Sequence, residues 1–123
     1  MEMIKNIAVL YGGSSSERQI SLQSGKGVHA AIKELGYESN LIDFNNITNL
    51  NELKIYDFVF IALHGFEGEG GKLQKSLDDL NILYSGSKAK ACRDTWNKKL
   101  TKEILEKNNI TTPIWLEAKF NKE

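Results

Sequence analysis

The stretch DFVFIALHGFEGEGG, residues 57–71, decides the fold. Its first part, 57–63, is an almost unbroken apolar run, which is typical of a strand covered on both faces of a parallel sheet. The run ends at His64-Gly65 and continues into a glycine-rich loop that carries two glutamates. Glycine density of this kind indicates a backbone shaped around a bound group.

Apolar runs and helical patterns alternate in both directions from this stretch. Further strands are predicted at 4–11, 37–43 and 82–84, with the start of one more at 114–120, and helices at 21–35, 73–80 and 89–107. Residues 45–53 read as a loop with room for one helical turn. The order β-α-β-β-α-β-α predicts an α/β fold, with a mostly parallel, Rossmann-like sheet flanked by helices.

Length and charge narrow the class of protein. The 123 residues suit one domain with a single core, and 16 basic residues balance 16 acidic ones. A net charge of zero gives no support for nucleic acid or an anionic membrane as partner. No apolar run has the length of a membrane span, and the single cysteine, Cys92, suits a reducing compartment. We therefore expect a cytoplasmic domain with neither a nucleic-acid nor a membrane partner.

Ligands of parallel α/β sheets bind beyond the carboxyl ends of the strands. The loops at 12–18, 64–72 and 85–88 each follow a predicted strand. We therefore expect these three loops to meet at one edge of the sheet, where their polar side chains would form the candidate site.

The loop GGSSSER, residues 12–18, contains Glu17, for which two interpretations are open. Glycines after a strand allow a sharp turn, and the amides that open the next helix favour an anion, although the spacing differs from GxGxxG. Ser14 and Glu17 stand three residues apart, as in a capping box, so Glu17 could serve only backbone N–H groups. Alternatively, its carboxylate belongs to a site.

His64 also has a plain structural interpretation, because a histidine at a strand end can simply satisfy a hydrogen bond. Its place beside two acids and several glycines favours a site. The spacing of Glu67 and Glu69 from His64 matches no metal-ligand motif, so no metal site is predicted in the chain. His29 reads as structural or solvated. Lys98 lies in a helical stretch of mixed charge, which is usually a solvated face.

Taken in order, these segments resemble the amino-terminal part of D-alanine–D-alanine ligases, which are members of the ATP-grasp superfamily. GGSSSE at 12–17 corresponds to the family's GGxSxE, HGFEGEGGKLQ at 64–74 to HGxxGEDGxLQ, YSGS at 84–87 to YTGS, and Asn97-Lys98 to a DK pair that opens a helix. Order and spacing match along essentially the whole chain. Gly70 and Asn97 depart from the pattern, since each stands where the family has aspartate.

The resemblance implies a role for each matched residue. Glu17 would bind the ammonium of the first D-alanine, Ile20 would pack on its methyl group, and His64 would order its site, so Glu17 and His64 are the candidate catalytic residues. Lys98 would reach the ATP phosphates. In the family, ATP phosphorylates the carboxylate of the first D-alanine, and the amine of the second attacks the acyl phosphate. Magnesium (or manganese) neutralises the phosphates, and the dipeptide enters peptidoglycan, which maintains cell shape.

The resemblance also implies how the chain is divided. Residues 1–96 would form a substrate domain of the pre-ATP-grasp type, and 97–123 the connecting helix and the start of a truncated central domain. Members of the family commonly form homodimers. Their magnesium ligands and most ATP contacts lie further along the sequence, so this chain by itself is expected to be inactive, with no ATP or metal bound.

A stand-alone α/β module that binds a small molecule or a partner without catalysis is the alternative. The apolar alternation at 114–120 argues against it, because a finished domain would not end on such a segment. A flavodoxin-like receiver domain would need an acidic cluster at the strand ends, and the first strand ends in Tyr-Gly-Gly instead.

Overall fold

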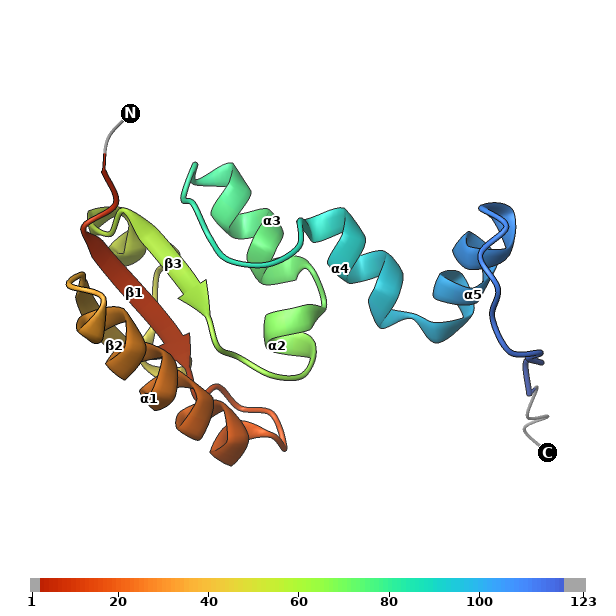
Figure 1. The fold of residues 1–123 in the computed structure, drawn as a ribbon, viewed down its shortest axis with the longest axis horizontal. Coiled ribbons are helices and arrows are strands. Elements are labelled where there is room, and N and C mark those ends of the chain that lie inside the picture. The colour runs from red at the N-terminus through yellow and green to blue at the C-terminus, as the bar shows by residue number, and fades with distance from the viewer. Residues whose placement is uncertain (1–2, 119–123) are drawn as a thin grey trace.

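A computed structural model describes residues 3–118 of the chain (Figure 1). Three parallel strands form one sheet in the order β2-β1-β3: β1 (Asn6–Tyr11), β2 (Glu38–Asp43) and β3 (Phe58–Ile61). In the register, Val9 of β1 lies between Leu41 of β2 and Phe60 of β3. The predicted α/β class and the parallel sheet are confirmed.

Helices cover both faces of this sheet. The helices of the chain are α1 (Arg18–Glu34), the two 3-10 helices η1 (Phe44–Asn46) and η2 (Leu50–Ile55), then α2 (Phe66–Glu69), α3 (Lys72–Asp79), α4 (Ala89–Trp96) and α5 (Lys98–Lys107), of which α1 covers one face and α3 and η2 the other. The segment predicted as a loop after β2 therefore holds two 3-10 helices. The glycine-rich loop after β3 folds locally into α2.

Alternation along the strands divides the core into two clusters. Odd-numbered residues of β1, Ile7 and Val9, pack with Ile32 of α1. The even-numbered Ala8 and Leu10 face the opposite side, where they pack with the leucines of α3 and η2. Successive side chains of a strand point to opposite faces, so a central strand that is apolar at every position needs cover on both sides.

The strand predicted at 82–84 is reduced to a single bridge between Val59 and Tyr84. Backbone hydrogen bonds join Val59 to Leu83 (2.8 Å) and to Ser85 (3.0 Å). The next strand amide, that of Ile61, donates to the Ser85 hydroxyl at 2.9 Å instead of to a carbonyl. A side chain thus replaces the backbone ladder, and the chain leaves the sheet at Gly86, whose φ is +92°.

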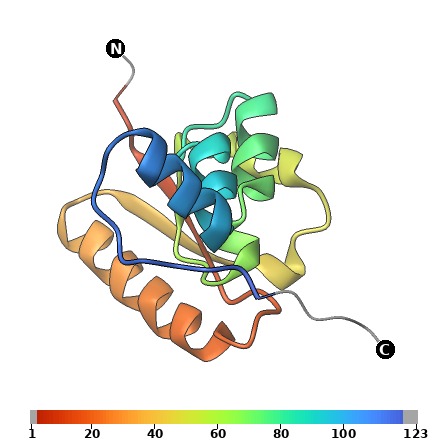
Figure 2. The same cartoon turned by 90° about the vertical axis from the view of Figure 1, so that its right-hand side faces the viewer.

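The single helix predicted at 89–107 is wrong, because the helix is broken in two at Asn97. Asn97 has an extended backbone (φ −86°, ψ 110°), and its side chain accepts a hydrogen bond from the amide of Leu100 (3.0 Å), so it caps α5. Helices α4 and α5 extend away from the sheet as an arm (Figure 1), which points toward the viewer in Figure 2. None of the described helices is long and apolar enough to cross a bilayer.

The strand predicted at 114–120 is also wrong where it can be checked. Residues 114–118 have no strand conformation, and 119–120 lie outside the described residues. Ile114 and Leu116 are almost fully exposed. An alternating segment becomes a strand only when a sheet edge offers hydrogen-bond partners, and the arm holds this one away from the sheet.

Candidate functional site

The loops after β1 and β3 meet at the carboxyl edge of the sheet, as expected from parallel topology. The backbone amide of Ser14 donates to one oxygen of Glu67 (2.8 Å), and the Ser14 hydroxyl donates to the other (2.5 Å). The loop after Tyr84 joins them through the hydrogen bond between Ser85 and Ile61. The expected convergence of the three loops is therefore confirmed.

A buried serine fixes the turn at the end of β1. Gly12 and Gly13 have φ values of +77° and +73°, a left-handed conformation that residues with a Cβ rarely adopt. The Gly12 amide donates to the Ser21 hydroxyl (2.9 Å), which donates in turn to the carbonyl of Ala62 (2.7 Å). Ser21 is fully buried, so this chain of bonds ties β1, α1 and the end of β3 together.

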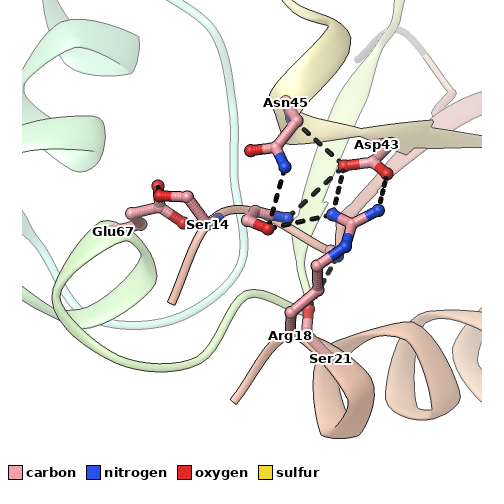
Figure 3. Close-up of polar contacts among 8 residues, drawn as sticks. Ser14, Arg18, Ser21, Asp43, Asn45 and Glu67 are labelled. Atoms are coloured by element: carbon pink, nitrogen blue, oxygen red, sulfur yellow. Dashed lines mark hydrogen bonds and ion pairs between the residues drawn. The ribbon is translucent and has the colours of Figure 1, made fainter. Parts of the chain in front are cut away.

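An ion pair holds the outer side of the same turn (Figure 3). The Arg18 guanidinium donates to both carboxylate oxygens of Asp43 (2.9 and 2.5 Å) and to the carbonyl of Gly13 (2.9 Å). The Asn45 side chain donates to that carbonyl as well (3.1 Å). Hydrogen bonding from Arg18 is the main cause that lowers the pKa of Asp43 to about 2, so this carboxylate is ionised at neutral pH.

Glu17 lies at the N-cap position of α1, and the capping-box interpretation is wrong. Its side chain makes no capping hydrogen bond, and the Ser14 side chain bonds to Glu67 instead. The Glu17 residue is exposed. A carboxylate oxygen of Glu17 lies 3.6 Å from the point that a Cβ on Gly65 would occupy, so the carboxylate borders the loop after β3.

Ile20 lies in the first turn of α1, and His64 contacts the same helix at Ser24. The His64 ring is within hydrogen-bond distance of the Ser24 hydroxyl (Nε2 to Oγ, 3.2 Å). Ile20 is 53% exposed, although it is a large apolar side chain. Glu17, Ile20 and Ser24 follow helical spacing and share one face of α1, which faces the loop after β3. His29 bonds through Nδ1 to the Ser39 hydroxyl (2.8 Å), as its structural interpretation predicted.

A cavity of about 540 Å³ opens beside His64, between α1, β3 and α4. Its wall includes Ser24, Gln74 and Trp96. The Gln74 side chain is buried and donates to the carbonyl of Gly68 (2.5 Å), while its own oxygen has no hydrogen-bond partner among the described residues. Apolar and polar groups thus share one hollow at the carboxyl edge.

Lys98 is not brought together with Glu17 and His64. It is exposed, opens α5, and forms no ion pair within residues 3–118. The helix does open at the Asn97-Lys98 pair, as the motif predicted, because asparagine caps a helix about as well as aspartate. Over the described part of the chain, no three His, Cys, Asp or Glu side chains cluster to hold a metal ion.

Gly70, which stands where the family has aspartate, is closely packed against Phe66. A Cβ at Gly70 would lie 2.5 Å from ring atoms of Phe66 and 2.7 Å from its carbonyl oxygen. The Phe66 ring packs edge-to-face on Trp96, with ring centroids 5.4 Å apart. Glycine at this position therefore accommodates the contact that docks α4 against α2.

Sequence reasoning missed Arg18, Asp43 and Glu67 as supports of the site. Arg18 and Asp43 are 25 residues apart, and Ser14 and Glu67 are 53 apart. No local periodicity relates such pairs. The available signal was topological, since Asp43 is the last residue of β2 and Glu67 lies in α2 after β3, so both reach the same edge.

Comparison with known proteins identifies the relatives of this fold and loop arrangement. D-alanine–D-alanine ligase of Bordetella avium is 40% identical over 119 residues, which are 95% of this chain and 37% of that protein. The Aquifex aeolicus ligase is 44% identical over 110 residues, 89% of this chain and 38% of its own. The chain is homologous to D-alanine–D-alanine ligases. No protein-family model matches it.

A solved ligase structure has the same fold. D-alanine–D-alanine ligase from Bacillus anthracis, complexed with ATP, matches with a TM-score of 0.86 and 36% identity, over 97% of this chain and 41% of that one. The chain thus spans about two fifths of the length of these three ligases. Its motifs are those of their amino-terminal domain.

Proposed function

We propose that this chain is the domain that binds the first D-alanine in an ATP-dependent D-alanine–D-alanine ligase. One observation carries the proposal. The exposed Glu17 carboxylate borders Gly65 at the carboxyl edge of the sheet, next to His64. A carboxylate with no side-chain capping role, in that position, suits a substrate ammonium through charge-assisted hydrogen bonds.

In this proposal each residue acts on the bound amino acid. Glu17 holds the ammonium, and the exposed Ile20 side chain covers the methyl group. His64, oriented by its hydrogen bond to Ser24, orders the same pocket. These contacts fix the carboxylate of D-alanine for phosphoryl transfer from ATP, and positioning supplies much of the rate enhancement in such reactions.

ATP supplies the phosphoryl group, and Lys98 at the start of α5 would meet its phosphates. Magnesium or manganese would accompany ATP, but the described residues offer no carboxylate cluster for a divalent ion. We therefore assign no step of the metal chemistry to this chain. The ATP complex of the Bacillus anthracis relative supports ATP as the co-substrate.

The break at Asn97 supports a domain division at that point. Residues 1–96 would form the substrate domain, and 97–123 the connecting helix and the start of the central domain. Helix α5 packs chiefly on α4, which fits a connecting role. The dipeptide product would serve peptidoglycan synthesis in the cytoplasm.

Association into a homodimer is part of the proposal. Met3, Leu35 and Leu83 are 61–75% exposed. Met3 and Leu83 line a hollow of about 810 Å³, with Tyr37, at the opposite edge of the sheet from Glu17. Light scattering should give twice the monomer mass at micromolar concentration. The exposed Ile114 and Leu116 could pair non-natively, so a chain ending at Asn109 serves as control.

A chimera tests the catalytic proposal. The matching segment of the Bacillus anthracis ligase is replaced by this chain, and ATP-dependent D-alanyl-D-alanine formation is measured. We expect activity that Glu17→Ala removes. A folded chimera without activity, together with binding of some other small molecule by the chain, would favour the non-catalytic module.

A further inference from the structure

The contact between Ser14 and Glu67 joins two loops of the site, and neither residue has a role in the proposed function. Glu67 accepts the backbone N–H of Ser14 with one oxygen (2.8 Å) and the hydroxyl of the same residue with the other (2.5 Å). Two hydrogen bonds from one residue to both oxygens of a carboxylate fix its orientation as well as its distance. Figure 3 shows this contact beside the Arg18 network.

The turn before Glu17 is therefore held from two sides. On the β2 side, Arg18 and Asn45 both donate to the carbonyl of Gly13. On the α2 side, the Glu67 carboxylate lies against the α-carbon of Gly13, so closely that a Cβ there would overlap it. Glu67 thus supplies a side-chain contact that links this turn to the loop of His64, in addition to the buried Ser21 bridge to Ala62.

Glu17 follows Ser14 by three residues, and Glu67 follows His64 by three. Two residues of backbone therefore separate Ser14 from Glu17, and two separate Glu67 from His64, so the Ser14–Glu67 contact lies close in sequence to both substrate residues. Helix α2 has only four residues, and the Ser14–Glu67 contact holds it on the side of the turn, opposite the hydrogen bond from Gln74 to the Gly68 carbonyl. A shift at this contact would change the separation between the Glu17 carboxylate and the His64 loop.

We propose that Glu67 is a positioning residue, whose contact with Ser14 sets the separation between the loops that carry Glu17 and His64. The inference rests on the proposed function, because it concerns the geometry of the same D-alanine site. Glu67 itself has both oxygens engaged and does not touch the substrate. Its loss should weaken the hold on the first D-alanine in the ground state and in the transition state alike, which raises KM and leaves kcat nearly unchanged.

Three variants of the active chimera test this role. Glu67→Ala removes both hydrogen bonds and should raise the KM for the first D-alanine about 3- to 10-fold, the usual range for a lost hydrogen bond. Glu67→Gln can accept the Ser14 N–H and donate to its hydroxyl, so it should restore KM to within about twofold. Glu34→Ala, an exposed glutamate at the other end of α1, is the matched control and should change nothing.

A second measurement separates a local effect from loss of the fold. In the 123-residue chain, hydrogen exchange at the Ser14 amide should accelerate in Glu67→Ala and recover in Glu67→Gln, while the Leu10 amide in β1 stays protected. Equal acceleration at Leu10 would make Glu67 a support of the whole domain and overturn the proposal. An active chimera in which Glu67→Ala leaves the KM for the first D-alanine unchanged would also overturn the positioning role of Glu67. An inactive chimera without any substitution would instead refute the proposed function itself.

Discussion

Arg18 and Asp43 form a two-pronged ion pair that closes the turn between β1 and α1 onto the end of β2. The pair is partly exposed, with 34% of the Arg18 side chain and 17% of the Asp43 side chain accessible to water. Exposed ion pairs contribute little by charge alone. The importance of this one lies in its geometry, because the same guanidinium also fixes the carbonyl of Gly13.

The ion pair predicts how stability depends on pH. The pKa of Asp43 is lowered to about 2 in the folded chain, against about 3.9 for an unfolded aspartate. Because the pKa is lowered on folding, the ionised Asp43 carboxylate stabilises the folded chain fully above about pH 4, and this stabilisation is lost as the pH falls toward 2. Asp43→Asn should therefore lower Tm at pH 7 and flatten the fall of Tm between pH 4 and 2.

Thermal melts of the two proteins across this range measure the effect. The pKa values of Asp57 and Asp78 are also lowered, by backbone hydrogen bonds and by Lys88 respectively, so both proteins keep some acid dependence. The difference between the two curves isolates Asp43. Parallel curves from pH 7 to 2 would show that the Arg18–Asp43 pair does not stabilise the fold.

Gly13→Ala should destabilise the chain by about 1–2 kcal/mol or more. The substitution puts a Cβ on a residue with φ +73°, which alone costs about that much, and the new methyl group also displaces Glu67. Gly27→Ala is the matched control, because a Cβ at Gly27 meets nothing within 4 Å and α1 gains about 0.5–1 kcal/mol. Urea unfolding of both variants should give shifts of opposite sign.

Asn97→Ala should weaken α5 by about 0.5–2 kcal/mol, the usual cost of a lost cap. Asn97→Asp should have little effect, because aspartate accepts the same hydrogen bond from the Leu100 amide. Since α5 packs chiefly on α4, the loss should be local. Hydrogen exchange at Leu100 should accelerate in the alanine variant, while exchange in β1 is unchanged. Acceleration in β1 as well would show that the arm is coupled to the sheet.

The sequence predicts those elements whose apolar pattern is continuous along the chain. The strand at 57–63 was predicted because the run FVFI is apolar at every position, and α1 because an apolar stripe runs to Leu35 before Gly36. Periodicity missed the break at Asn97, since the apolar stripe of 89–107 continues through it, and the resemblance alone placed a helix start at Asn97-Lys98. A single capping side chain, which periodicity does not register, divides the helix.

The sequence also predicted only part of the site, namely the residues that stand in recognisable motifs. Glu17, Ile20 and His64 stand in motifs, so a resemblance could single them out, and parallel topology could place their loops at one edge. Their supports could not be found in this way. Asp43 and Glu67 act through contacts with residues 25 and 53 positions away, and only the folded chain brings these together.

Glu17→Gln distinguishes a substrate residue from a structural one. The Glu17 side chain makes no cap, so its substitution should change the stability of the isolated chain by less than about 0.5 kcal/mol. In the chimera, the KM for the first D-alanine should rise, because glutamine keeps the shape of the side chain but not its charge. Thermal melts beside kinetics separate the two effects. A loss of stability with unchanged KM would remove Glu17 from the substrate site.

The isolated chain should release no phosphate from ATP in the presence of D-alanine and magnesium. Phosphoryl transfer needs a metal ion and several preorganised cations around the phosphates. The described residues hold no metal-ligand cluster. Lys99, which follows Lys98 in α5, is already paired with Glu117 (Nζ to Oε2, 2.8 Å).

Lys98 alone offers the phosphates about 1 kcal/mol of attraction at contact distance in water, which is too little to bind or activate them. D-alanine should bind to the chain very weakly or not at all, since Glu17 and Ile20 are exposed to water. A phosphate-release assay with Lys98→Ala as the matched variant tests this. Release above background that Lys98→Ala abolishes would mean that the arm carries catalytic groups, against this prediction.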